Sequence, residues 1–107
     1  MTDLTDMWEA LEAHQHIADW NDYGKAWAHM CKERTAASAT AAAYAANAAN
    51  AANAAAANAA ANAAANAAYG AAYGAADHHS KRAIAFITKA NDGLAYVHSL
   101  ITQGEIV

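Results

Sequence analysis

The chain has 107 residues, and 57% of them are hydrophobic, mostly alanine, so we expect a single domain (1–107) with a modest core. A formal net charge of −4 excludes a general binder of nucleic acid or of anionic membranes, because both need clustered Lys and Arg. The single cysteine, Cys31, excludes an internal disulfide and favours a cytoplasmic location, as does a start that lacks the pattern of a secretory signal.

Two short helices are predicted before residue 34. The first begins near Asp6, where Asp6 and Glu9 have the spacing of a capping box. Its apolar face comprises Leu4, Met7, Trp8 and Leu11. A turn is expected at residues 19–22. An apolar stripe with helical spacing follows, which we assign to the core: Trp20, Tyr23, Trp27 and Met30.

Residues 36–76 form a low-complexity tract in which 28 of 41 residues are alanine and none is charged. Alanine has the highest helix propensity, so this tract is predicted to be helical. Its nine Asn and Tyr residues from Tyr44 to Tyr73 recur on average every 3.6 residues, which is one per helical turn. A bilayer span is rejected, because the tract lacks Leu, Ile, Val and Phe and carries six asparagines.

The length of this tract favours a break. A straight helix of 41 residues would be roughly 60 Å long, about twice the width of a compact domain of this size. The irregular step from Asn53 to Asn58 indicates either a correction of phase or a break into two helices, and we favour a break in 50–58. Gly70 and Gly74 have the spacing that permits close approach of another helix. These features predict an all-α fold, a small bundle of about four to five helices around one long Ala/Asn-rich helix or a helical hairpin.

A final helix is predicted from near Asp77 or Ser80. Its apolar face comprises Ile84, Ile87, Leu94, Val97 and Ile101. The turn signal Asn91-Asp92-Gly93 is expected to divide this helix, and Gly104 to cap its end.

The histidines and acids offer little that resembles a catalytic or metal site. Six histidines are present, but none is paired at the spacing that zinc ligands take on a helix, so we expect no metal and no cofactor. Glu12 and His16 are four residues apart, which suits a general base, but no nucleophile accompanies them. We interpret this pair as a stabilising contact along one helix, and we expect no enzymatic activity.

The most informative candidate is a stripe of uncharged polar residues at spacings of four, four, three and four, the Asn/Tyr stripe: Asn58, Asn62, Asn66, Tyr69 and Tyr73. One interpretation is structural: the stripe is the solvated face of a helix whose alanine faces pack on neighbours. The other is functional: the stripe is a partner-binding surface, since Tyr and Asn offer contact area or hydrogen bonds at small entropic cost.

The stretch AAAYAANAANAANAAAANAAANAAANAAYGAAYGAAD resembles the alanine-repeat helices of bacterial toxin-immunity proteins and of small phage accessory proteins. Those relatives usually carry Arg, Asp, Glu or His where this chain has Asn. The resemblance implies a small protein that binds and neutralises another protein, and it assigns no residue a role.

We therefore expect a non-enzymatic intracellular inhibitor, of the toxin-immunity or phage anti-defence (anti-CRISPR-like) kind, that binds a protein partner through a helix face. One alternative is a self-assembling structural protein that forms a homodimer through its alanine and glycine faces. Two others are ice binding and mimicry of nucleic acid by the six acids that precede Lys25.

Overall fold

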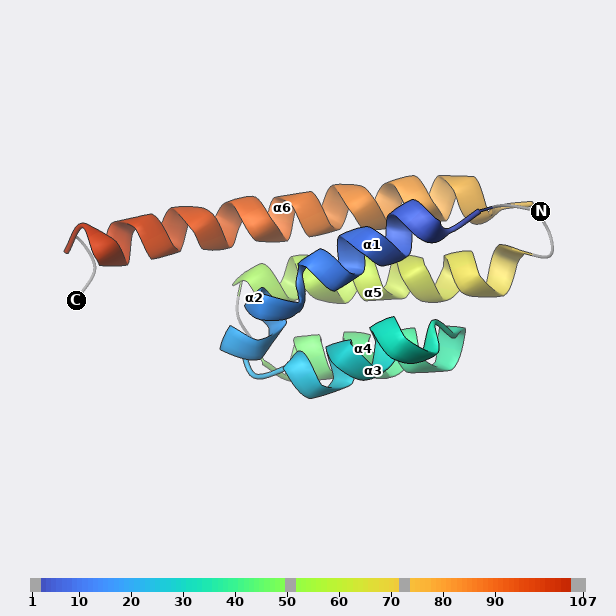
Figure 1. The fold of residues 1–107 in the computed structure, drawn as a ribbon, viewed down its shortest axis with the longest axis horizontal. Helices are drawn as coiled ribbons and strands as arrows, with labels where there is room; N and C mark the ends of the chain where they lie inside the picture. Colours follow the sequence, from blue (N-terminus) through green and yellow to red (C-terminus); the bar gives the residue numbers. More distant parts are fainter. Residues whose placement is uncertain (1–2, 50–51, 72–73, 105–107) are drawn as a thin grey trace.

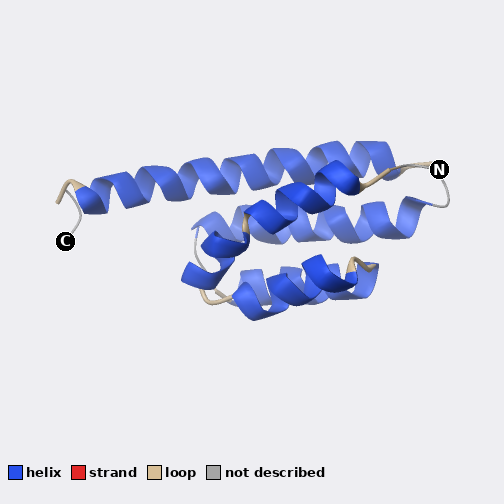
Figure 2. Cartoon of the chain, in the orientation of Figure 1, coloured by secondary structure: helices blue, strands red, loops and turns tan. Residues whose placement is uncertain are grey.

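The all-α prediction is confirmed by a computed structural model, which describes residues 3–49, 52–71 and 74–104. The described residues form helices joined by short turns (Figures 1 and 2). In chain order the helices are α1 (Thr5–Ala13), α2 (Gln15–Trp20), α3 (Gly24–Glu33), α4 (Ala36–Ala48), α5 (Ala52–Gly70) and α6 (Ala76–Thr102).

The first two helices are one helix interrupted at His14. The His14 N–H bonds the Leu11 carbonyl at 3.2 Å, a tighter turn than the α-helix makes, and helical bonding resumes at Ile17. The predicted capping box at Asp6 is wrong, because α1 begins at Thr5 with no side-chain cap at Leu4. The Asp3 carboxylate instead accepts a bond of 2.9 Å from the Thr5 N–H.

Two tight turns join α2 to α3 and α3 to α4. In the first, which the sequence predicted, Asp22 takes a left-handed backbone (φ 68°) and Gly24 lies against Asp19, where no Cβ would fit. In the second, Arg34 is left-handed and its N–H bonds the Met30 carbonyl at 2.8 Å. Thr35 then caps α4 through a reciprocal capping box with Ser38.

The alanine tract is divided into α4 and α5, as its length suggested. Helix α4 ends at Ala48 and α5 begins at Ala52, near the start of the expected interval 50–58. The irregular step from Asn53 to Asn58 is not the break, because both asparagines lie within α5. That step is a shift of phase within a continuous helix.

Helix α6 is continuous through Asn91-Asp92-Gly93, so the predicted division there is wrong. Gly93 serves close packing instead of a turn: a Cβ at this position would lie 2.6 Å from the Oδ1 of Asn53 in α5. Gly104, just beyond the helix, has φ +77°, which fits the expected C-terminal cap.

Helices α4, α5 and α6 lie side by side in one layer with alternating directions, and α1 and α3 pack on one face of this layer (Figure 1). Helix α6 contacts α5 and α1, and its C-terminal end projects beyond the other helices, in a molecule that measures 49 × 21 × 18 Å. The large buried side chains gather where the two layers meet, and they include Met7, Trp8, Leu11, Tyr23, Trp27, Met30 and Ile87.

The alanines form the contacts within the layer. Successive turns of α4 and α5 bury alanines against each other and against α6, including Ala42, Ala46, Ala57, Ala60, Ala64 and Ala67. Side chains this small let helix axes approach to about 8 Å. Gly70 and Gly74 do not take part, since Gly70 ends α5 and a Cβ at Gly74 would meet nothing within 4 Å. Among the helices of the described residues, none has the length and apolarity to cross a membrane.

Candidate binding site: a polar groove between α5 and α6

The Asn/Tyr stripe lies on α5, on the side that the alanine contacts leave uncovered. Asn62 and Asn66 are exposed and Asn58 is half-buried. Tyr69, near the end of α5, has 75% of its surface exposed. Tyr73 lies outside the described residues. The stripe is therefore displayed along α5 and is not part of the core.

Three residues of α6 face the stripe: His79, Arg82 and Phe86. Helices α5 and α6 form an antiparallel hairpin (Figure 1), and the close approach of Gly93 to Asn53 fixes how the two helices align. Counted from the approach of Gly93 to Asn53, this alignment places His79 near the level of Asn66, Arg82 near Asn62 and Phe86 near Asn58, and all six residues line one cavity.

Together these side chains line the polar groove, defined by Asn58, Asn62, Asn66, His79, Arg82 and Phe86, with Ala59 and Ala63 at its base. Its cavity volume is about 260 Å³. Ligand pockets usually measure 300–1,000 Å³, so this groove has room for a side chain or a small acid but not for a large cofactor.

Arg82 gives the polar groove a positive charge, because among the described residues that line the groove Arg82 alone is charged. The facing helix, α5, has no charged residue. Among the described residues Arg82 forms no ion pair, and its Cζ lies 5.6 Å from the centre of the Phe86 ring. A cation–π contact of this kind holds the guanidinium group beside the groove and leaves its N–H donors available.

His79 adds an unsatisfied polar atom to the same wall. Its Nδ1 is buried and has no hydrogen-bond partner within the described part of the chain. A buried polar atom without a partner costs about 1–3 kcal/mol. An unsatisfied nitrogen in the wall of a polar cavity calls for an explanation, and a bound ligand or water would supply the missing hydrogen bond.

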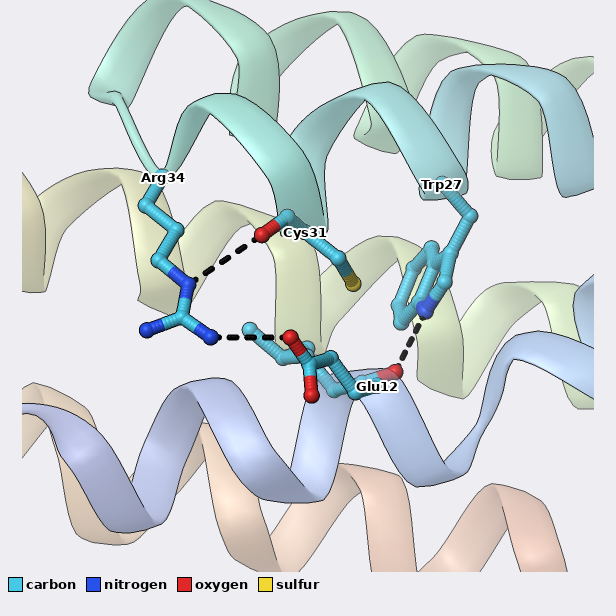
Figure 3. A network of polar contacts seen from close by, with 5 residues as sticks. Glu12, Trp27, Cys31 and Arg34 are labelled. Atoms are coloured by element: carbon cyan, nitrogen blue, oxygen red, sulfur yellow. Dashed lines mark hydrogen bonds and ion pairs between the residues drawn. The ribbon is translucent and has the colours of Figure 1, made fainter.

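The Glu12–His16 pair does not form the contact that its spacing suggested. Because the helix is interrupted at His14, Glu12 belongs to α1 and His16 belongs to α2. Arg34 instead donates to the Glu12 carboxylate at 2.8 Å and to the Cys31 carbonyl at 3.1 Å (Figure 3). Both members of the ion pair are about half exposed, so the pair contributes no more than about 1 kcal/mol.

Cys31 and the histidines do not assemble a reactive centre in the described residues. Burial is the main cause that raises the pKa of the Cys31 thiol to about 11, so the thiol is protonated at neutral pH. Throughout residues 3–49, 52–71 and 74–104, no three His, Cys, Asp or Glu side chains gather as metal ligands. His78 and His79 are adjacent, with ring centres 5.4 Å apart.

His14 has a structural role that the sequence did not reveal. It is fully buried, and its two ring nitrogens bond Asn91 Oδ1 at 3.0 Å and the Tyr23 hydroxyl at 2.6 Å. Oδ1 can only accept, so Nδ1 carries the proton and Nε2 accepts from Tyr23. Burial lowers the pKa of His14, which keeps the ring neutral. This network joins α1, α3 and α6.

A second and larger hollow, of about 910 Å³, lies between α2 and α6 and is lined by His16, Ile17, Asp19, Trp20, Asn91, Asp92 and Ala95. Trp20 is 53% exposed there, so its assignment to the core is wrong, whereas Tyr23, Trp27 and Met30 are buried as expected. The chain reverses between Trp20 and Tyr23, and the two residues therefore do not share a helix. The lining of this hollow is mostly apolar and contains no residue of the Asn/Tyr stripe.

His79, Arg82 and Phe86 were not singled out from the sequence. A signal was present, because a hairpin that turns near Gly70 and Gly74 sets residues equally far from the turn opposite each other. That pairing depends on contacts between α5 and α6, which the apolar or polar pattern of either helix alone does not show.

Comparisons of the chain with protein-family models, with curated proteins and with solved structures gave no match.

Proposed function

We propose that this chain is a non-enzymatic, cytoplasmic inhibitor that binds another protein through the polar groove and the adjacent Tyr69, in the manner of toxin-immunity or phage anti-defence proteins. The observation that carries the proposal is the exposure of Asn62, Asn66 and Tyr69 on a helix whose other sides are buried. The single buried cysteine suits a reducing compartment.

The packing of α5 supports a binding role for this face. Buried alanines fix the helix between α4 and α6, so the backbone that carries the amides and the phenol is held in place. A contact surface that is already rigid loses little conformational entropy on binding. Tyrosine adds a large contact area with few rotatable bonds, which suits Tyr69 as an anchor beside the groove.

The Glu12 carboxylate, which with His16 suggested a general base, is engaged by Arg34, and the Cys31 thiol is buried and protonated at neutral pH. These contacts support a binding role over a catalytic one. Most alanines of α4 and α5 pack within the chain, and a Cβ at Gly70 or Gly74 would meet no described helix, so these faces give the self-assembly alternative little support.

The experiment is capture of partners by the tagged chain from lysate of its source or host, with bound proteins identified by mass spectrometry. The test variant is Asn62→Ala, Asn66→Ala, Tyr69→Ala. The matched control is Tyr44→Ala, Asn47→Ala, because these two residues are also exposed on an alanine helix but lie on α4. One stoichiometric partner that the test variant loses and the control retains is the expected result. Equal capture by both variants would remove this surface from the proposal.

A further inference from the structure

We propose that the polar groove is a receptor for a single carboxylate group, in the form of an Asp or Glu side chain that a partner protein inserts between α5 and α6. The inference rests on the proposed function for the identity of the partner, but the affinity for a carboxylate rests on the groove alone.

The charge of the groove selects an anion. Among the described residues, Arg82 carries the only formal charge in the lining, and none neutralises it with an ion pair. A ligand with one negative charge therefore balances the site.

The hydrogen-bond donors of the groove favour a carboxylate. A guanidinium group binds a carboxylate through two parallel N–H bonds, and the side chain of Asn62, level with Arg82, can donate a further bond to the same oxygens. Asn66 and His79 stand one turn away on their helices and can bond the backbone that carries the acid. The unpartnered Nδ1 of His79 gains a partner if its ring turns towards the groove.

The size and apolar end of the groove point to a side chain. Ala59, Ala63 and Phe86 provide apolar contact for one or two methylene groups beside the polar donors. The cavity of about 260 Å³ holds an acidic side chain but is too small for a nucleotide. A phosphate group would bring a second negative charge that the single Arg82 does not balance.

The test is an NMR titration of the ¹⁵N-labelled protein at constant ionic strength. The probes are acetate, the capped tripeptide acetyl-Ala-Glu-Ala-amide, its Gln counterpart and inorganic phosphate. We expect saturable shifts of the Arg82 Nε–H and the Asn62 side-chain amide with both carboxylates, with dissociation constants on the order of millimolar, and none with the Gln peptide. Tighter binding of the Glu peptide than of acetate identifies a polypeptide as the source, and equal binding identifies a free small acid.

The variants separate a site from general attraction of anions. Arg82→Gln should weaken carboxylate binding at least about tenfold, and Arg82→Lys should weaken it less, because lysine keeps the charge but loses the paired bonds. Lys81→Gln is the matched control, since Lys81 is exposed, adjacent and outside the groove lining. Equal weakening by the Lys81 and Arg82 variants, non-saturable shifts, or tighter binding of phosphate than of acetate would overturn the inference.

The two proposals fail in different ways. If the Asn62, Asn66, Tyr69 variant loses a captured partner while no carboxylate binds saturably, only the carboxylate inference is overturned. If carboxylates bind and Arg82→Gln abolishes this binding, yet no protein is captured, only the proposed function is overturned.

Discussion

Replacing Tyr23 by phenylalanine tests the buried network that joins α1, α3 and α6. The substitution removes one hydroxyl and keeps the ring, which contacts Trp27 edge-on with ring centres 5.6 Å apart. Tyr23 is 1% exposed and its bonded partner His14 is 0% exposed, so water cannot replace the lost bond. Phenylalanine therefore leaves the His14 Nε2 buried without a donor.

The size of the effect follows from that orphaned acceptor. An unsatisfied buried acceptor costs about 1–3 kcal/mol, and the small gap left by the oxygen adds to this cost. For a domain of this length, each 1 kcal/mol lowers Tm by about 4 °C or more. The expected change is therefore a loss of roughly 1–3 kcal/mol in the free energy of unfolding.

Urea unfolding monitored by circular dichroism measures this change, and the slope of the unfolding curve should stay constant. The matched control is Tyr69→Phe, which removes the same hydroxyl from a side chain that is 75% exposed and should change stability by less than about 0.5 kcal/mol. If Tyr23→Phe destabilises the protein no more than Tyr69→Phe, the buried network contributes nothing and the reasoning is refuted.

Three further predictions follow from other contacts. Gly93→Ala should stabilise the protein by less than the roughly 1 kcal/mol expected from helix propensity, because the added Cβ would lie 2.6 Å from the Asn53 Oδ1. Adding Asn53→Ala should restore the missing stability, and a double-mutant cycle with no coupling would contradict this. Burial holds the pKa of His14 below 6.5, so the unfolded chain takes up a proton that the folded chain does not, and the free energy of unfolding should fall as the pH drops below 6.5. The variant His14→Gln should flatten this pH dependence in urea titrations. Thr35→Ala removes the capping box of α4 and should cost about 1 kcal/mol in the same assay, and an unchanged midpoint would deny the cap a role.

The parts of the fold that follow from local rules could be predicted from the sequence. The helix propensity of alanine and the recurrence of Asn or Tyr once per turn predicted that the tract is helical, and its length predicted the division into α4 and α5. The core positions of Trp8, Tyr23 and Trp27 followed from helical spacing. These predictions succeed because each depends on residues that are close in the chain.

The predictions that failed depend on contacts between distant residues. Asn91-Asp92-Gly93 has the local pattern of a turn, but the glycine is explained by Asn53 on the neighbouring helix. His14, where the helix is interrupted, bonds Tyr23 and Asn91, and no local pattern reveals these distant partners. The polar groove likewise needs both helices of the hairpin, so only half of its lining was recognised in advance.

The packing of α5 against α6 limits how the alanine tract can change in length. Inserting a three-residue Ala-Ala-Asn unit turns everything beyond it by roughly 300°, about 60° short of a full turn, whereas a four-residue unit overshoots by about 40°. One unit of each kind adds seven residues and nearly completes two turns, with an error of about 20°. Even then, the insertion would move Asn53 away from its position opposite Gly93 unless α6 gained the same number of residues. Repeat expansion within this low-complexity segment would therefore alter the fold and would not be neutral.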